Sequence, residues 1–311
     1  MTELVERRNC PVCSTASMGT VYSCAYSMEP VAGFLRESYA PFAAGKLAEA
    51  LHEAEFALDE CGVCGLVYQR WAPGENLLAD IYGEWAYQGS SMESAEKRLS
   101  LNNYAAFTRE IMTMIAMFDR PPWSIRALEY GMGWGFWARM AKAFGVDVWG
   151  IEVSGEKVER AAGWGILAPD ESVAGSFDYV NADQVMEHLH SPLETMKTIA
   201  GYLRPGGIAR IGVPDGSGIK EEFAGRGVSP GLNLAFPLLH LNVFNESSLR
   251  NLGKLAGLTP YSPPRRKIFV TTNWTPLKRA ILSVWRPLWR KNYWGDGVAY
   301  FIKDGKAPEG R

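Results

Sequence analysis

Four of the five cysteines form two pairs, each with two residues between the thiols: Cys10 with Cys13, and Cys61 with Cys64. In a reducing compartment, such pairs are more typical of metal ligands than of disulfides. Two intervening residues allow a tight turn to direct both sulfurs at one centre, and two such turns supply a tetrahedral zinc site. The pattern predicts a structural zinc ion, because four thiolates leave no open coordination position for catalysis.

The segment between Cys13 and Cys61 is longer than a minimal zinc ribbon requires, so the two turns would have to meet across an insertion. Cys24 and His52 are possible substitute ligands. The alternative interpretation is two unrelated thiol pairs with redox or structural roles.

A second chemically unusual stretch is LEYGMGWGFWARM, with glycine at Gly131, Gly133 and Gly135. It ends a strand-like run and begins a helix-like one, which is where a doubly wound sheet binds nucleotides. Glycine lets the backbone turn sharply and lets a ligand lie against it. Glu152 ends the next strand-like run, GIEVS, and an acid there accepts hydrogen bonds from ribose hydroxyls. These residues alone predict a dinucleotide or another adenosine ligand.

Alternating strands and helices must position these residues. Strand-like and helix-like runs follow one another in four pairs: IRALEY and WARMAKAF, DVWGIEV and EKVERAA, FDYVNA and LETMKTIAGYL, and IARIGV and, after a long loop, SSLRNLGKLAG. The alternation predicts an α/β fold with βαβ units and a parallel sheet covered by helices on both faces.

The chain of 311 residues is long enough for a large domain and a small one. Residues 1–88 are predicted to form the small zinc-binding domain, and residues 123–311 the α/β domain. Apolar residues at helical spacing predict one long amphipathic connector helix within 89–122, with Glu110 on its water-facing side.

Four segments resemble, in this order, the successive motifs of class I S-adenosylmethionine-dependent methyltransferases: ALEYGMGWG, GIEVS, FDYVNADQVMEHLHSPLETMKTIAGYLRPGGIARIGVPD and HLNVFNESSLRNLGKLAGL. The third is the most specific, with a strand ending in EHL, a helix, LRPGG and a strand ending in VP. With the cysteine pairs in front, the chain resembles sugar-type and other small-molecule methyltransferases that carry an N-terminal zinc-binding domain. The resemblance implies a Rossmann-like seven-stranded sheet whose last strand is antiparallel, and VAYFIKD at residues 298–304 would be that strand.

The resemblance also implies that S-adenosylmethionine is the cofactor. It places this cofactor on Glu129, the three glycines and Glu152, and it puts Asp183 at the methionine end. Trp134 is bulky for a loop that cradles phosphate, which argues against a dinucleotide. The acidic residue that the family has beside the adenine has two candidates here, Asp170 and Glu171.

Methyl transfer from a sulfonium is an in-line displacement, so holding the reacting atoms collinear in a dry pocket supplies most of the acceleration. A base is needed only for a weakly acidic acceptor, such as a sugar hydroxyl or a carbon beside a ketone. His188 and His240 are the candidate catalytic residues. In related sugar C-methyltransferases a Tyr-x-Glu-His segment supplies the base at the place of His240. Here Leu239 stands at the Glu position, so this segment lacks the orienting carboxylate.

Residues 265–292 form a basic insertion with eight basic residues and no acid. Apolar and basic side chains of residues 276–291 fall on different faces of a helix, although Pro287 interrupts it. Three interpretations stay open: a packed helix, a basic wall for a phosphate-bearing acceptor such as a nucleotide-linked sugar, or a surface resting on an anionic membrane that carries a lipid-linked acceptor.

A formal net charge of -2 gives no indication that the protein as a whole binds nucleic acid. Without a secretory signal or a run of about 18 apolar residues, the protein is predicted to be cytoplasmic. An RNA methyltransferase with a zinc ribbon is one alternative, which the acid-rich residues 46–60 disfavour. A non-catalytic scaffold that keeps the fold is another, which the intact glycine run and Glu152 disfavour. No residue pattern indicates an oligomeric state.

Overall fold

The structure is a computed structural model that describes residues 4–39, 47, 51, 53–81, 91–226, 228–263 and 297–305. The chain divides into two compact units. The cysteine unit comprises Met1–Ser91, Met186–Thr195 and Val213–Leu255. The α/β unit comprises Met92–Val185, Met196–Gly212 and Ala256–Arg311. The cysteine unit therefore takes in two later segments that the sequence pattern groups with the α/β domain.

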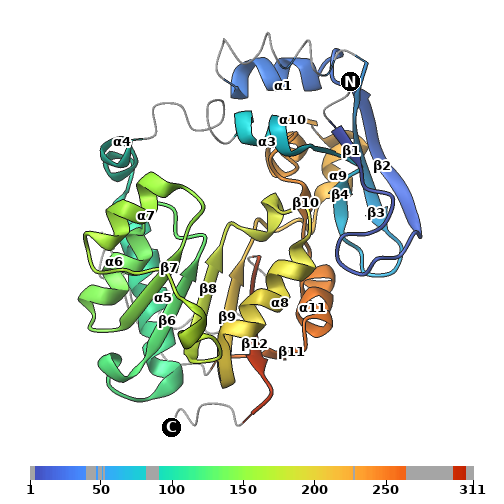
Figure 1. The fold of residues 1–311 in the computed structure, drawn as a ribbon. Coiled ribbons are helices and arrows are strands. Elements are labelled where there is room, and N and C mark those ends of the chain that lie inside the picture. The colour runs from blue at the N-terminus through green and yellow to red at the C-terminus, as the bar shows by residue number, and fades with distance from the viewer. Residues whose placement is uncertain are drawn as a thin grey trace, which may run out of the picture. The chain divides into compact units, whose positions relative to one another are not determined.

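A four-stranded antiparallel sheet forms the centre of the cysteine unit (Figure 1). Its order is β10 (Asn242–Val243), β4 (Val67–Gln69), β3 (Glu55–Cys61) and β2 (Met18–Ala25). A separate two-stranded sheet joins β1 (Leu4–Glu6) to β5 (Trp71–Pro73). Because β10 pairs with β4, the segment that follows the predicted IARIGV strand contributes directly to this sheet.

Apolar side chains from both parts of the cysteine unit form one core, which includes Phe56, Leu58, Leu77, Leu232 and Leu238. Burial of each such side chain contributes about 1.5–3 kcal/mol relative to exposure. In the described residues, helices of this unit include α1 (Val31–Ser38), α3 (Glu75–Asp80), α9 (Ile219–Glu221), the π-helical η5 (Glu222–Arg226), α10 (Val228–Leu234) and α11 (Glu246–Leu255). The core ties residues before 82 to residues after 218, so neither segment buries its apolar surface alone.

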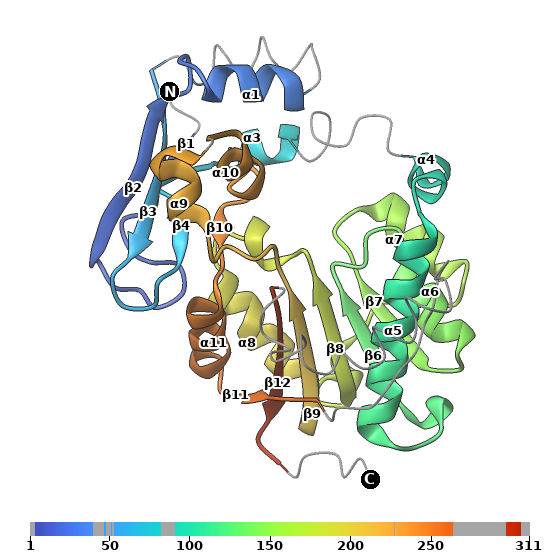
Figure 2. The same cartoon turned by 180° about the vertical axis from the view of Figure 1, so that it is seen from behind.

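The α/β unit contains a mixed sheet (Figure 2). Its order is β11 (Leu258–Tyr261), β12 (Val298–Lys303), β9 (Leu203–Gly212), β8 (Phe177–Asp183), β6 (Arg126–Tyr130) and β7 (Asp147–Ile151). Strands β9, β8, β6 and β7 are parallel, and β12 runs antiparallel to both of its neighbours. The predicted α/β class and the antiparallel last strand are confirmed.

This sheet has six strands among the described residues instead of the seven predicted. The chain between β7 and β8 forms helix α7 (Gly155–Ala162) and the 3-10 turn η3 (Glu171–Val173). Beyond β7, one parallel bridge joins Trp149 to Leu167. The short connection thus leaves a single paired residue where a further edge strand would form.

The connector is two helices, α4 (Met92–Lys97) and α5 (Leu101–Phe118), instead of the single one predicted. A capping box at Ser100 causes the break. The Ser100 hydroxyl accepts a hydrogen bond from the Asn103 amide at 3.3 Å, and the Asn103 side-chain oxygen accepts one from the Ser100 amide at 2.8 Å. These bonds satisfy orphan donors at a helix start, so a new helix begins at this point.

Helix α5 packs against α6 (Phe136–Ala143), and α6 lies against β6 and β7 (Figure 2). Helix α8 (Pro192–Tyr202) leads into β9. No helix in the described part of the chain combines the length and the apolar content needed to cross a bilayer. The basic insertion at 265–292 lies outside the described residues.

Candidate functional site

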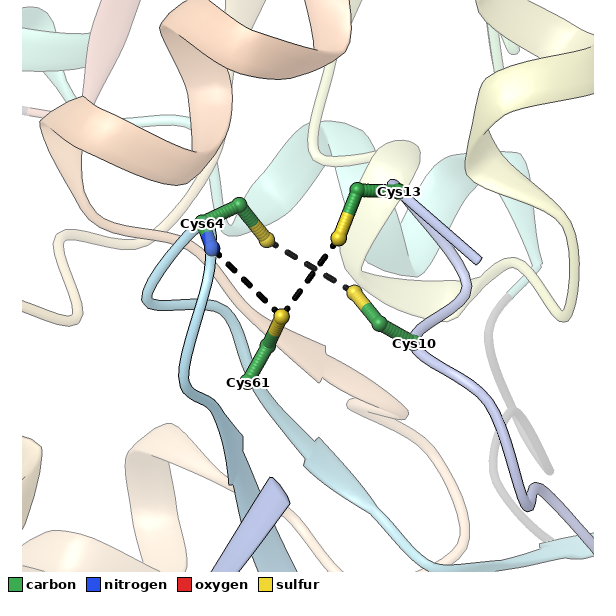
Figure 3. A group of neighbouring side chains, drawn as sticks. All are labelled: Cys10, Cys13, Cys61 and Cys64. Carbon is green, nitrogen blue, oxygen red and sulfur yellow. Dashed lines mark hydrogen bonds between the residues drawn. The ribbon is translucent and has the colours of Figure 1, made fainter. Parts of the chain in front are cut away.

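The four paired cysteines converge on one point, as the sequence predicts (Figure 3). Their sulfur atoms all lie within 4.8 Å of one another. The sulfurs of Cys10 and Cys64 are 3.6 Å apart, and those of Cys13 and Cys61 are 3.4 Å apart. A tetrahedral ion with Zn–S bonds of about 2.3 Å needs sulfurs about 3.8 Å apart. The four thiols therefore fit a zinc ion and are too far apart to be disulfide-bonded.

Tight turns direct these thiols. Cys61 ends β3, and the turn to β4 closes with Gly65 at a φ of 73°, in the left-handed region that glycine adopts without strain. The backbone amides of Val63 and Cys64 both point at the Cys61 sulfur, at 3.4 Å each. Asn245 donates from its side chain to the Gly65 carbonyl at 2.7 Å, so the residue preceding α11 braces the turn.

The pKa values of the clustered thiols are shifted in different directions. Hydrogen bonding from the Cys64 thiol lowers the pKa of Cys10 to about 5, while the same contact raises the pKa of Cys64. Burial raises the pKa of Cys13 to about 11. Without an ion, the contacts thus favour the thiolate of Cys10 and the thiols of Cys13 and Cys64, and a divalent cation would favour thiolates.

The two substitute ligands lie elsewhere. The sulfur of Cys24 contacts the carbonyl oxygen of Ala25 at 3.5 Å, and Cys24 is not among the residues of the thiol cluster. His52 lies outside the described residues.

In the α/β unit, the glycine run forms a tight loop between β6 and α6. Gly131, Gly133 and Gly135 have φ angles of 72°, 53° and 68°, so all three occupy the left-handed region. A β-carbon at Gly131 would lie 2.6 Å from Cγ2 of Val185, whereas one at Gly133 would have no atom within 4 Å. Gly131 is therefore needed for packing, while Gly133 has open space beside it.

Glu152 lies directly against this loop. One carboxylate oxygen accepts a hydrogen bond from the Gly133 amide at 2.8 Å, and the other accepts from the amides of Val153 and Ser154 at 3.0 and 3.1 Å. The structure thus brings together the two features that the sequence connects with a nucleoside ligand.

Glu129 is buried behind the loop and accepts a hydrogen bond from the Ala138 amide at 3.0 Å. That amide belongs to the first turn of α6, where backbone donors have no partner within the helix. Burial raises the pKa of Glu129 well above its usual range, although the Ala138 hydrogen bond opposes this. The observed role of Glu129 is to hold the start of α6.

Asp183, at the end of β8, is anchored by a buried arginine. Arg210 on β9 donates to Asp183 and to Glu110, at 2.8 Å in both cases, and to Asn181 at 3.0 Å. The expectation that Glu110 faces water is wrong, because it pairs with Arg210. Burial raises the pKa of Glu110 to about 7, with the Arg210 charge acting in the opposite direction. No sequence pattern indicates Arg210, which lies within an otherwise apolar part of β9.

The two candidate catalytic histidines meet within the cysteine unit. The ring centroids of His188 and His240 are 5.0 Å apart. His188 Nδ1 lies 3.0 Å from the Leu239 carbonyl oxygen, and His240 Nδ1 lies 2.8 Å from that of Leu234. Because a carbonyl only accepts, these contacts assign the hydrogen of each neutral ring to Nδ1.

Both imidazoles are neutral at pH 7. Burial, assisted by the neighbouring His240, lowers the pKa of His188 to about 4. Burial also lowers the pKa of His240. A carboxylate does lie near the pair, since Glu187 Oε1 is 3.9 Å from His188 Nε2, which is longer than a hydrogen bond. Glu187 is part of the EHL motif, but the motif alone does not indicate that its carboxylate lies near both histidines.

Comparison with a family model identifies a domain that includes segments of both units. Residues 102–262 match the model of a family described as a methyltransferase domain. No curated protein matches the chain.

Several solved structures are similar to the chain. A SAM-dependent methyltransferase from Thermotoga maritima, described as a possible histamine N-methyltransferase, is 17% identical over 68% of this chain and 95% of that one, with a TM-score of 0.44. A SAM-dependent methyltransferase from Archaeoglobus fulgidus is 16% identical over 68% and 97%, with a TM-score of 0.42. The 1,6-didemethyltoxoflavin-N1-methyltransferase of Burkholderia thailandensis, solved with S-adenosylhomocysteine, is 19% identical over 68% and 83%, with a TM-score of 0.41.

Proposed function

The chain belongs to the family of methyltransferase domains, and from this premise we propose that it transfers the methyl group of S-adenosylmethionine to a sugar or another small metabolite. The acceptor atom in this proposal is an oxygen or a carbon. The cysteine unit has a structural role, with Zn²⁺ held by Cys10, Cys13, Cys61 and Cys64. The contact between Glu152 and the glycine loop is the observation that carries the proposal.

The proposed cofactor site uses the loop for shape and Glu152 for recognition. Open space beside Gly133 allows an adenosyl group to approach the backbone. The Glu152 carboxylate accepts hydrogen bonds, which is what two ribose hydroxyls require. Gly131 and Gly135 shape the loop, Glu129 supports it through α6, and Asp183, which accepts a hydrogen bond from Arg210, faces the methionine end.

Isothermal titration calorimetry with S-adenosylmethionine and S-adenosylhomocysteine tests this site. Charge-assisted hydrogen bonds contribute about 1.5–3 kcal/mol, so we expect Glu152→Gln to weaken binding about 10-fold to 100-fold. Glu156→Gln is the matched control, because Glu156 lies four residues further on in the exposed first turn of α7. A folded wild-type protein that gives neither heat nor a thermal shift with either ligand would refute the proposal.

When bound, the cofactor supplies a methyl group on a sulfonium sulfur, which the acceptor atom displaces in line. Two tasks remain for the protein. It must hold the acceptor in position and exclude water, and it must take the proton that a sugar hydroxyl loses. In the proposal, a neutral imidazole of His240 or His188 accepts that proton at Nε2, because Nδ1 is engaged with a backbone carbonyl.

The role of His240 has a direct test. We expect His240→Gln to lower turnover about 100-fold while leaving calorimetric affinity for S-adenosylmethionine unchanged. His190→Gln is the control, since His190 lies two residues from His188 and outside the histidine pair. Unchanged turnover in His240→Gln would remove this residue from the mechanism.

A substrate panel tests the acceptor class. S-adenosylhomocysteine release is measured with free sugars, nucleotide-linked sugars and unmodified RNA. We expect turnover with a sugar and a preference for nucleotide-linked forms, because the insertion at 265–292 is basic. Turnover with RNA alone would favour the alternative of an RNA methyltransferase.

Co-sedimentation with vesicles, with and without anionic lipid, tests a membrane role for residues 276–291.

A further inference from the structure

We propose that Glu187, His188 and His240 form a second metal site, which takes a divalent transition-metal ion of the zinc class. One ligand atom from each residue lies within 4.8 Å of the other two. His188 Nε2 and Glu187 Oε1 are 3.9 Å apart. Two imidazole nitrogens and one carboxylate oxygen are a donor set that zinc and iron(II) prefer in proteins. This site is separate from the thiol cluster, which has its own four ligands.

Each histidine has the orientation of a metal ligand. A ligating imidazole normally donates its other N–H to a backbone carbonyl or a carboxylate, which fixes the ring and raises its basicity. His188 does this through Nδ1 to the Leu239 carbonyl, and His240 through Nδ1 to the Leu234 carbonyl. Nε2 is consequently the coordinating atom in both rings, and an imidazole that binds the ion through Nε2 does not accept the acceptor's proton.

Hydrogen bonds from one side-chain amide, that of Asn242, connect the two segments that carry these ligands. Glu187 and His188 lie on η4 (Met186–His188), and His240 immediately precedes Leu241 and β10. The side chain of Asn242 donates to the carbonyls of Met186 and Leu189 at 2.9 and 2.7 Å. The two segments are therefore held in register by contacts that do not involve the ligands themselves.

The side chain of Gln69 holds the turn before His240 in place. Gln69 donates to the carbonyls of Phe236 and His240 at 2.9 Å each, and it accepts from the Leu238 amide at 3.0 Å. Leu238 has a φ of 70°, which is unfavourable for a residue with a branched side chain. A strained turn that buried hydrogen bonds hold in place is typical of a functional position.

Charge and distance are also compatible with a bound cation. The Glu187 side chain is 1% exposed, and a nearby cation offsets the cost of burying a carboxylate. Zn–N and Zn–O bonds of about 2.1 Å place tetrahedral ligand atoms about 3.4 Å apart, so small side-chain rotations would complete the site. Three protein ligands leave a fourth position for water or an acceptor hydroxyl. Only this last point rests on the proposed function.

Metal content of the full-length protein, measured by mass spectrometry after equilibration with buffered Zn²⁺, tests the inference. We expect two equivalents in the wild type and in His190→Gln, and one equivalent in His240→Gln and Glu187→Gln. In titrations with Zn²⁺, the loss of either ligand should weaken the second equivalent by more than about 100-fold, because changes to residues that merely support a ligand already cost about 10-fold to 100-fold. If Glu187→Gln does not fold, His240→Gln decides alone.

Replacement of zinc by Co²⁺ distinguishes the two sites. The first equivalent is expected to show thiolate-to-cobalt charge transfer, and the second to add ligand-field absorption without it. A wild-type protein that saturates at one equivalent would overturn the inference, as would a His240→Gln variant that retains two. Calorimetry with S-adenosylmethionine on the same samples separates this failure from a failure of the proposed function.

Discussion

The thiol cluster and the glycine loop both lie at tight turns that follow strands. The thiol cluster uses the side chains of its turns, whereas the glycine loop uses the backbone. After β3, the turn brings side chains inward, and the four sulfurs lie within 4.8 Å of one another. After β6, the turn has glycines where side chains would stand, and the space beside Gly133 stays open. The first turn therefore specifies its ligand by residue type, and the second makes room for a ligand that other residues must recognise.

The difference also concerns stability. In the cysteine unit, the two turns that carry the paired cysteines meet at the thiols. The binding energy of an ion held there would therefore contribute to folding. Both units have a buried apolar core, with Phe56 and Leu232 in the cysteine unit and Ile111 and Trp137 in the α/β unit, but the cysteine unit has the thiol cluster in addition. We therefore expect metal removal to destabilise the cysteine unit and cofactor removal to leave the fold of the α/β unit intact.

The largest effect is expected when Cys61 and Cys64 are both changed to serine. Apparent zinc-binding energies of about 10–16 kcal/mol in small zinc domains match or exceed the usual 5–15 kcal/mol stability of a domain. The double variant should lose the zinc equivalent of the thiol cluster and the thermal transition of the cysteine unit, as measured by metal analysis and calorimetry. Cys24→Ser should change neither, and a double variant that retains this zinc would show that the cluster does not bind it.

A smaller effect is expected at the glycine loop. Gly133→Ala meets no protein atom, so its cost is the strain of a positive φ, about 1–2 kcal/mol. A methyl group in the open space should still weaken S-adenosylmethionine binding, and we expect a loss of about 100-fold or more by calorimetry. Gly131→Ala should lower the thermal transition of the α/β unit further, because its β-carbon would lie 2.6 Å from Val185.

Gly201→Ala in α8 is the control for both loop variants, since nothing lies within 4 Å of its added carbon. Replacing a helical glycine by alanine should raise stability by up to about 1 kcal/mol and leave cofactor affinity unchanged. Equal cofactor affinity in Gly133→Ala and Gly201→Ala would contradict a cofactor seat at this loop.

The comparison also shows which features the sequence could predict. The thiol ligands and the glycine loop are local patterns, in which residue type and spacing nearly determine the geometry. The parallel direction of β6 to β9 follows from the alternation of strands and helices, and the structure confirms it. A short connection reduced the expected seventh strand to the Trp149–Leu167 bridge, and the capping box at Ser100 divided the connector helix.

Features that depend on contacts between distant residues were not predictable. Glu110 has a polar position on an amphipathic helix, and only the fold brings Arg210 on β9 to within 2.8 Å of it. Likewise, Glu187 supplies a carboxylate beside His188 that the local segment around His240 lacks. Arg210 is far from Glu110 along the chain, and Glu187 is far from His240, so no local spacing could reveal that these residues meet.

The last expected effect is a difference in pH dependence between the two units. Burial raises the pKa of Glu110 from 4.5 to about 7, so the folded protein holds this proton at a higher pH than the unfolded chain does. The associated stability is fully present below the unfolded pKa and is lost as pH rises through about 7. Zinc held by thiolates behaves in the opposite way, since acid protonates its ligands and releases the ion.

We therefore expect the α/β transition, identified by its response to Gly131→Ala, to be less stable at about pH 8 than at about pH 5, by at most about 3 kcal/mol from Glu110. Glu110→Gln should reduce this slope, and Glu156→Gln should leave it unchanged. Calorimetry across this pH range should also show the zinc-dependent transition weakening towards acid. If Glu110→Gln kept the full slope, the buried contact with Arg210 would already hold this carboxylate ionised, and the pH dependence of the α/β unit would have to come from another buried acid such as Glu129.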